Sequence, residues 1–262
     1  MPLQASNIDE VLAILSQIIA DCAARRDPLG YFPALYRQVT LRVKGGIEQG
    51  FFDDGPRMDR FDALFANRYL AAYEAFTTGG TPSKCWQVAL GATRAGRTII
   101  LQDLLVGINA HINLDLGVVT GETFRGPALE GFRGDFDKIN QILAALVPPV
   151  EAVIARFSPL FGILERLGGR DALEVLNFSL DAARDDAWLH ATLLSIQPPV
   201  AWPLTIQALD RKVAFLGRLI AQPGGLVGRA VELIRETESR DVPAIIAALD
   251  SLEPAGPVSP LA

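Results

Sequence analysis

The sequence is poor in the residues that bind metals and form covalent cross-links. Among 262 residues there are two cysteines and two histidines. This excludes a zinc site built from several histidines, whereas a metal held by one or two histidines and carboxylates stays open. Cys22 and Cys85 each lie in an apolar helical pattern, which favours buried free thiols over a disulfide. Glycine-rich nucleotide loops, G-x-S-x-G, H-E-x-x-H, CxxC pairs and D-D-x-x-D are also absent.

Basic clusters and uninterrupted apolar spans are missing too. Lysine and arginine number 24 against 30 acidic residues, and a net charge of −6 without a basic stripe predicts no nucleic-acid partner. Residues 98–117 are the candidate for a membrane span, but amides, carboxylates and a histidine interrupt them, which predicts no membrane span. The opening segment MPLQASNIDEV has no basic stretch before an apolar run. We therefore expect no signal peptide and a cytoplasmic, bacterial-type protein.

Apolar residues, by contrast, are abundant. They make up 50% of the chain, and the mean hydropathy is +0.25. Such a composition indicates a large core, together with apolar surface in an oligomer contact or a ligand cavity, and it is compatible with a homo-oligomer. No linker divides the chain, so we predict a single helical domain over residues 1–252 and a flexible tail over 253–262.

Helical periodicity runs through almost the whole chain, and no alternating stretch indicates a strand. The sequence predicts an all-α fold of about ten helices around a central, buried polar helix at 98–117. Capping and breaking residues set the expected helix boundaries: a capping box at Ser6 and Asp9, a helix start at Thr81-Pro82, a loop over 118–131, and a helix end at Pro148-Pro149.

The central segment LLVGINAHINLDLG carries polar residues along two lines. Because each helical residue advances by about 100°, His111 and Asp115 share one face, with Gly107 one turn before them. Asn109 and Asn113 share the opposite face, in line with Gln102, and apolar flanks separate the two lines. A helix of this kind is surrounded by protein, and its buried amides need hydrogen-bond partners.

His111 and Asp115 are the candidate catalytic pair. A carboxylate one turn away orients an imidazole and raises its basicity, and the missing side chain of Gly107 is expected to leave room over the ring. The alternatives are a satisfied core histidine and a metal or haem ligand. For Asn109 and Asn113, the alternative to substrate binding is that they tie neighbouring segments to the central helix.

A second polar line lies in EVLNFSLDAARDDAWLH. Asn177, Asp181, Arg184 and Trp188 recur at helical spacing, and Arg184 is placed to pair with Asp181. An exposed, salt-bridged face is the plain interpretation, but a tryptophan at its end favours a buried partner for the line.

These residues resemble a bacterial all-helical family classified only as a domain of unknown function. The resemblance rests on A-H-I-N-x-D-L at 110–116, together with YFPALYRQVT, FFDD, FDALFANRYLAAYEAF, DFDKIN and ARDDAW, and it spans roughly residues 30–190. It implies no reaction. It implies that the following residues stand at the family's pattern positions: Tyr69, Trp86, Asn109, His111, Asn113, Asp115, Asp135, Asn140, Arg184 and Trp188. Asp135 is equally interpreted as a helix-start residue.

We therefore expect a cofactor-independent enzyme acting on an apolar or mixed-polarity small molecule, with His111 and Asp115 as the acid–base pair. Cyclisation, isomerisation, elimination or hydrolysis of a metabolite in a biosynthetic context all fit. The expected substrate-binding residues are Asn109, Asn113, Tyr69, Trp86, Asn140, Asp181, Arg184 and Trp188. The alternatives are a non-catalytic binding protein with the same cavity and a metal- or haem-dependent enzyme using His111.

Overall fold

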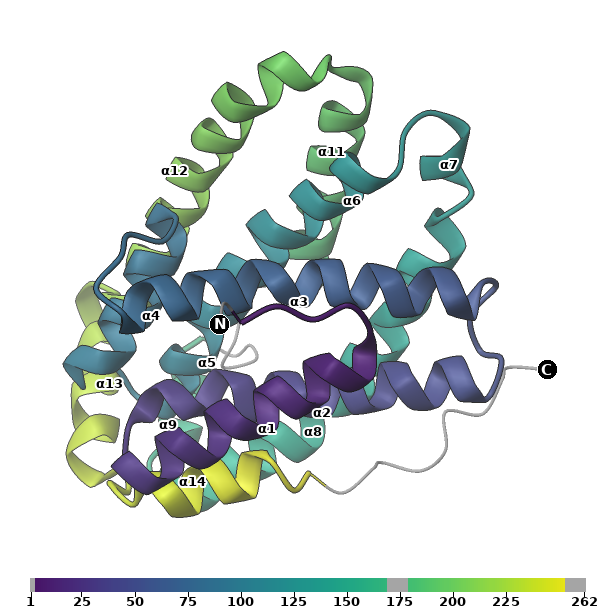
Figure 1. Cartoon of the computed structure of the whole chain (residues 1–262). Helices are drawn as coiled ribbons and strands as arrows, with labels where there is room; N and C mark the ends of the chain where they lie inside the picture. Colours follow the sequence, from purple (N-terminus) through teal and green to yellow (C-terminus); the bar gives the residue numbers. More distant parts are fainter. Residues whose placement is uncertain (1–2, 169–178, 253–262) are drawn as a thin grey trace.

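A computed structural model describes residues 3–168 and 179–252, and every regular element in those ranges is a helix (Figure 1). The all-α prediction is confirmed. The α-helices are α1 (Ile8–Arg25), α2 (Tyr31–Glu48), α3 (Gly55–Thr77), α4 (Lys84–Ala95), α5 (Ile100–Ala110), α6 (Gly117–Thr123), α7 (Pro127–Glu130), α8 (Arg133–Phe157), α9 (Gly162–Gly168), α11 (Leu180–Ile196), α12 (Trp202–Ala221), α13 (Gly225–Thr237) and α14 (Val242–Leu249). Short 3₁₀ turns lie at Pro28–Gly30 and Pro199–Ala201, and a π-helical segment, His111–Leu116, joins α5 to α6. The predicted tail at 253–262 lies outside the described residues.

The α5–π–α6 helix occupies the centre of the fold. From Thr98 to Gly121 every residue is buried except the half-buried Ile108. Helices α2, α4, α11 and α12 pack around it. Its N-terminal amide at Ile100 donates to the carboxylate of Glu238 at 3.0 Å, which satisfies a backbone donor that the helix itself leaves free. The expectation of a buried polar helix at 98–117 is therefore met.

The close approach of α6 to α11 depends on two glycines. A Cβ atom on Gly117 would lie 2.8 Å from the carbonyl oxygen of Ala187, and one on Gly121 would lie 2.7 Å from the Cβ of Leu194. The facing side of α11 carries the small residues Ala187 and Ala191, so the two helices pack almost backbone to backbone.

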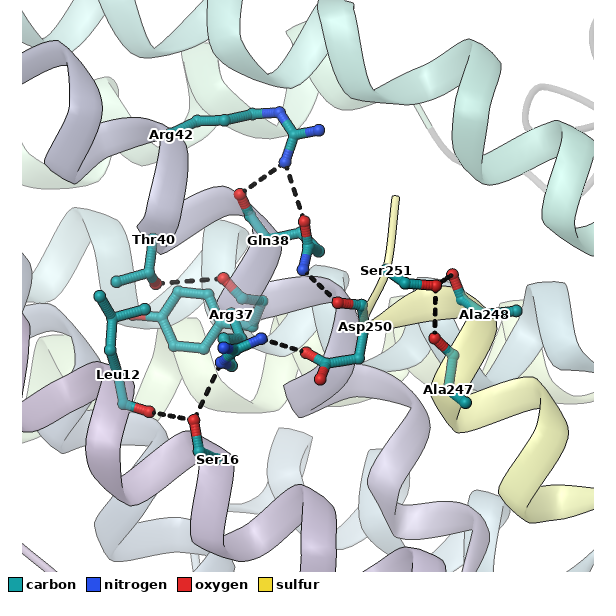
Figure 2. Close-up of polar contacts among 11 residues, drawn as sticks. Leu12, Ser16, Arg37, Gln38, Thr40, Arg42, Ala247, Ala248, Asp250 and Ser251 are labelled. Atoms are coloured by element: carbon teal, nitrogen blue, oxygen red, sulfur yellow. Dashed lines mark hydrogen bonds and ion pairs between the residues drawn. The ribbon is translucent and has the colours of Figure 1, made fainter. Parts of the chain in front are cut away.

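The C-terminal helix α14 is fastened to α2, as Figure 2 shows. Arg37 forms an ion pair with Asp250 at 2.7 Å, and the amide of Gln38 donates to the backbone carbonyl of Asp250 at 2.5 Å. Arg42 reaches the carbonyl of Leu252 at 3.4 Å. These contacts fix α2, the helix that supplies Tyr36 to the cavity described below.

Two predicted helix starts are wrong in detail. At α1 the cap is Asn7, whose side chain accepts from the amide of Glu10, and not a Ser6–Asp9 box. At α4 the helix begins after Ser83, two residues beyond the predicted pair, and its first amides donate to Asp210 of α12 at 2.9 Å. A cap from a distant helix leaves no local sequence signal.

Two predicted interruptions are also wrong. The expected loop at 118–131 is helical through Thr123 and again in α7, because Gly121 serves the contact with α11 and not a turn. Helix α8 continues through Pro148-Pro149 to Phe157. Leu146 and Ile154, on either side of the prolines, are both buried against the core. This tertiary packing outweighs the local cost of the prolines.

Two helical stretches are long and apolar enough to cross a membrane by length and composition alone, Ile100–Thr123 and Pro127–Phe157. In the first stretch, 94% of the apolar 18-residue segment is buried inside the protein, as expected of a core helix. The second, 17% buried, includes α8, which forms one wall of the cavity. Two such helices are weak evidence for a membrane span, and the absence of a span stays a prediction. Both cysteines are buried free thiols, as predicted.

Candidate functional site

His111 and Asp115 meet on one face of the central helix. Nδ1 of His111 lies 3.4 Å from Oδ2 of Asp115. The same carboxylate accepts from the indole of Trp86 at 2.8 Å and from Arg68 at 3.3 Å. Because the guanidinium of Arg68 balances its charge, Asp115 acts here chiefly as a fixed acceptor that holds the imidazole ring.

The pair lies in the π-helical segment, whose wider turn sets it apart from the α-helix on either side. The amide of Gly117 donates to Leu114, and the carbonyl of Asn113 accepts from Nδ1 of His190 at 3.1 Å. A side chain from α11 thus supports the irregular backbone. Burial lowers the pKa of His190, which favours the neutral ring, and the carbonyl acceptor then selects the tautomer that carries its proton on Nδ1. Single π turns of this kind are frequent at functional sites.

Aromatic rings enclose the imidazole of His111. Phe65 stacks on it with ring centroids 3.7 Å apart and an interplanar angle of 9°, and Tyr36 meets it edge-on at 4.6 Å. Phe32 and Trp86 complete the enclosure at 5.7 and 6.2 Å. Nε2 of His111 is buried and has no hydrogen-bond partner among the described residues.

Burial decides the charge of this ring. Removal from water lowers the pKa of His111 below its ordinary value, and this effect exceeds the opposing influence of Asp115. The sequence suggested that the carboxylate would raise the basicity of His111. The direction is the reverse because Arg68 offsets the charge of Asp115 while burial disfavours the imidazolium. The imidazole is therefore neutral at physiological pH.

His111 borders a cavity of about 140 Å³. Helices α2, α3, α5, α8 and α11 contribute to its wall, which is almost wholly aliphatic and aromatic. The polar or charged side chains in the wall are Tyr36, His111, Glu151 and Arg184. A concave apolar site with few polar groups is typical of small-molecule binding.

The expected room above Gly107 does not exist. A Cβ atom there would lie 2.5 Å from Cδ2 of Phe32, so the phenyl ring already fills the space that the missing side chain leaves. The cavity lies elsewhere, along Leu101, Leu105 and Ile108 of the same helix.

The opposite polar line ties the central helix to α12. The amide of Asn109 donates to Val213 at 3.0 Å, and that of Gln102 donates to Ile220 at 2.6 Å. Asn113 donates to the side-chain oxygen of Asn109 at 3.1 Å. The structure thus shows the tying role for Asn109 and Gln102, whereas the side chain of Asn113 bonds within the central helix.

Asn109 and Asn113 also line a second cavity, of about 150 Å³, together with Ser179 and Asp186. It lies on the other side of the central helix from His111. Of the expected substrate-binding residues, Arg184 lines the His111 cavity, whereas Asn109 and Asn113 line the second one and do not join the candidate catalytic pair.

The polar line on α11 is also divided. Asn177 lies outside the described residues. Asp181 is exposed and forms no ion pair with Arg184 within the described ranges, so the predicted pairing is wrong. Arg184 turns inward to the His111 cavity, whereas Trp188 is half-buried, with its ring 5.0 Å from Phe136. The line does not form one exposed face.

The remaining pattern residues lie outside the cavity wall. Asp135 lies in the first turn of α8, as its interpretation as a helix-start residue expected, but its carboxylate does not cap that helix. It accepts from the amides of Asp53 and Asp54 and from Arg57 at 2.6 Å, which anchors the segment before α3. Tyr69 is fully buried, with its ring 5.2 Å from that of Trp86. Asn140 is half-buried on α8 and is not in the cavity wall.

Several important residues were not identified from the sequence. Arg68, Phe65 and Tyr36 reach the site from other helices. Arg68 stands on α3 three residues after Phe65 and four before Ala72, and a cation on that apolar stripe was the available signal. Asp62, on the same helix, has a buried oxygen without a partner in residues 3–168 and 179–252, and burial raises its pKa to about 7.

This geometry provides no set of ligands for a metal ion. Among the described residues no group of three or more His, Cys, Asp or Glu side chains gathers in a way that would hold an ion. Near His111 the available donor is Asp115, and its oxygens already accept from Trp86 and Arg68.

Comparison with protein families identifies the family of this chain. It belongs to the family of unknown function DUF5995, whose model matches residues 8–223. The match covers the central helix and extends beyond the region of the sequence resemblance at both ends. No curated protein and no solved structure matches the chain.

Proposed function

We propose that this member of DUF5995 is a small-molecule enzyme in which His111 moves a proton inside the apolar cavity while Asp115 holds its ring. One observation carries the proposal: Nε2 of His111 is buried without a partner in the part of the chain that the structure describes, although Nδ1 of the same ring faces a carboxylate. Buried polar atoms of native proteins are nearly always hydrogen-bonded. An unpaired ring nitrogen beside a cavity fits a partner supplied by the ligand.

The protonation state suits a general base. With the proton on Nδ1, toward Asp115, the unpaired Nε2 presents a lone pair. Burial lowers the pKa of His111, which keeps this lone pair free at neutral pH. The apolar wall excludes water and strengthens the electrostatic interactions of a bound molecule.

The reaction class follows from what one neutral base can do. Isomerisation, elimination and cyclisation each begin with removal of a proton from the substrate, and hydrolysis begins with removal of a proton from water. The protonated His111 then returns the proton to the product. Asp115 is a positioning residue in this scheme, because its carboxylate is fixed by the indole of Trp86 and by Arg68 and faces Nδ1 of the ring.

The alternative is a binding protein that holds the same molecule without turnover. The almost wholly apolar wall favours this alternative, since few groups are available to stabilise charge that develops during a reaction. A metal- or haem-dependent enzyme is a further alternative, and metal analysis with an absorption spectrum of the purified protein tests it.

The test uses proton exchange with solvent. The purified full chain is incubated in D₂O with a panel of small apolar carbonyl compounds and unsaturated acids, and ¹H NMR follows loss of carbon-bound hydrogen or conversion. We expect wild type to act on members of the panel and His111→Phe to be slower by about 10²–10⁴-fold. His190→Asn is the matched control, since the chain has two histidines, His190 lies outside the cavity wall, and the asparagine amide can replace its Nδ1 donor to the carbonyl of Asn113.

Equal rates in wild type and His111→Phe would remove His111 from the mechanism. Binding of panel compounds without exchange or conversion would favour the binding protein.

A further inference from the structure

Arg184 is a buried cation that has no acidic partner among the described residues. It is 3% exposed, and no carboxylate in those ranges lies within ion-pair distance of it. The acidic residues that act on it from farther away are Asp137, Asp181 and Asp185. Asp137 is already paired with Arg133 at 2.8 Å, and the other two are exposed on α11.

The contacts that Arg184 does make leave its charge only partly compensated. Nη2 donates to the carbonyl of Phe136 at 2.5 Å, and the guanidinium lies 4.3 Å from the centroid of the Phe136 ring. Nε is buried without a hydrogen-bond partner in the described part of the chain. Burial lowers the pKa of Arg184 to about 10, which leaves the side chain charged at neutral pH. A buried charge without a counter-ion is strongly unfavourable, so its retention needs an explanation.

The position of Arg184 supplies that explanation. It lies in the wall of the cavity that His111 borders. Glu151, the acidic residue in this wall, has an interaction of its own. The remaining surface is aliphatic and aromatic apart from Tyr36. The cavity thus combines one cation without a counter-ion in the described ranges, one neutral base and an extended apolar surface.

We propose that the cavity binds a monocarboxylate with an apolar body, whose carboxylate pairs with Arg184 while the body lies along the aliphatic and aromatic wall. This rests on the proposed function, in which the same cavity holds the substrate. A guanidinium presents two parallel N–H donors that match the two oxygens of a carboxylate. One cation fits a single negative charge.

The cavity volume limits the size of the apolar body. At about 140 Å³ it is close to an engineered protein cavity of roughly 150 Å³ that binds benzene. The body is therefore about the size of one aromatic ring or of an aliphatic chain of comparable volume. Octanoate is a suitable probe, and 1-octanol is its uncharged match with the same chain.

The experiment measures binding of both probes to the full chain at pH 7.5 by titration calorimetry. We expect wild type to bind octanoate at least tenfold more tightly than 1-octanol. Arg184→Met weakens octanoate binding at least tenfold and leaves 1-octanol within about twofold, and Arg184→Lys is intermediate. Arg133→Met is the matched control, because it removes a neighbouring cation that does not line the cavity.

Folding of the variants is checked by thermal melts without ligand. Arg184→Met replaces an uncompensated buried charge with an apolar chain of similar length, so its Tm is expected to equal or exceed that of wild type. If Arg184→Met does not fold, Arg184→Lys alone decides, through a loss of octanoate affinity at unchanged 1-octanol affinity.

Three results would overturn the proposal: no octanoate binding to wild type, equal affinity for the two probes, or an octanoate affinity that is the same with Arg, Met or Lys at position 184. The outcome is separable from that of the proposed function. Octanoate binding that depends on Arg184, with no proton exchange on any compound, would support a protein that binds carboxylates without turnover. Proton exchange that needs His111 but not Arg184 would support the proposed enzyme and exclude the proposed carboxylate ligand.

Discussion

Along α5 and the π-helical segment, the buried polar groups on the two sides of the central helix differ in their hydrogen bonding. Toward α11 and α12, the amides of Gln102 and Asn109 and the carbonyl of Asn113 all have partners on neighbouring helices. Toward α2 and α3, Nε2 of His111 has none among the described residues. The side chains are buried to a similar degree on both sides, so burial alone does not separate a structural polar residue from a functional one.

The difference teaches that hydrogen-bond satisfaction is the informative property. A satisfied buried amide stabilises the fold and fixes the position of its neighbour. An unsatisfied atom beside a cavity costs stability and is retained for another reason. The α12 side is therefore interpreted as scaffold and the α3 side as site.

The largest expected effect separates activity from stability. His111→Phe keeps a planar ring against Phe65 and removes the unpaired nitrogen. We expect a free energy of unfolding within about 1.5 kcal/mol of wild type, because the swap nearly conserves volume. The activity found in the exchange assay falls by about 10²–10⁴-fold. Urea denaturation measures the first quantity, and a severe loss of stability would mean that His111 belongs to the scaffold.

The next effect is on the scaffold side, where Gly121→Leu is expected to cost about 3 kcal/mol or more. A side chain at this position meets the backbone of Ala191 at 2.8 Å, and backbone cannot move aside cheaply. Gly91→Leu is the matched control, since Gly91 lies on α4 and a Cβ atom added to it would meet nothing within 4 Å. Similar melting temperatures for the two variants would contradict the close packing of α6 on α11.

Asn109→Leu is expected to cost about 1–3 kcal/mol, because it strands the amide of Asn113 and removes the bond to Val213. Its activity per folded molecule is expected to match wild type, since Asn109 lies on the opposite side of the helix from the His111 cavity. Loss of activity without loss of stability would show that Asn109 belongs to the functional site, and it would contradict the difference between the two sides of the helix.

The smallest effect concerns pH. The pKa of His111 is lowered in the folded protein, so below its ordinary value of about 6.5 the unfolded chain binds more protons than the folded one. Its contribution to stability is therefore lost as the pH falls through that range. Wild type is expected to lose more free energy of unfolding between pH 7.5 and 5.5 than His111→Phe does. An equal loss in the two proteins would show that His111 has an ordinary pKa.

NMR provides the direct check of the same prediction. The chain has two histidines, and His190→Asn assigns their imidazole signals. A neutral His111 signal at pH 6.5 is the expected outcome.

The sequence was sufficient for what depends on helix geometry. The spacing of His111 and Asp115, and that of Gln102 and Asn109 on the other face, follows from residues within one or two turns. The all-α class and the buried central helix follow in the same way from local periodicity.

Partners on other helices could not be predicted. The bonds of Asp115 with Trp86 and Arg68 join α3, α4 and the central helix, and the packing of distant elements determines them. The inward turn of Arg184 is of the same kind, because local spacing suggested Asp181 as its partner. Helix α8 continues through Pro148-Pro149 for a similar reason: local propensity is overruled by contacts that the sequence does not display.

The π-helical segment has a consequence for the length of the chain. Each residue of an α-helix turns the backbone by about 100°, so the number of residues between two points sets their angular phase. His111–Leu116 adjusts that phase between Asn109, which faces α12, and Gly121, which must face α11. Deleting one residue here would let the helix become regular, but it would rotate α6 by roughly a quarter turn and point Gly121 away from its neighbour. Substitutions in this stretch change single contacts, whereas a change of length alters the orientation of everything that follows it.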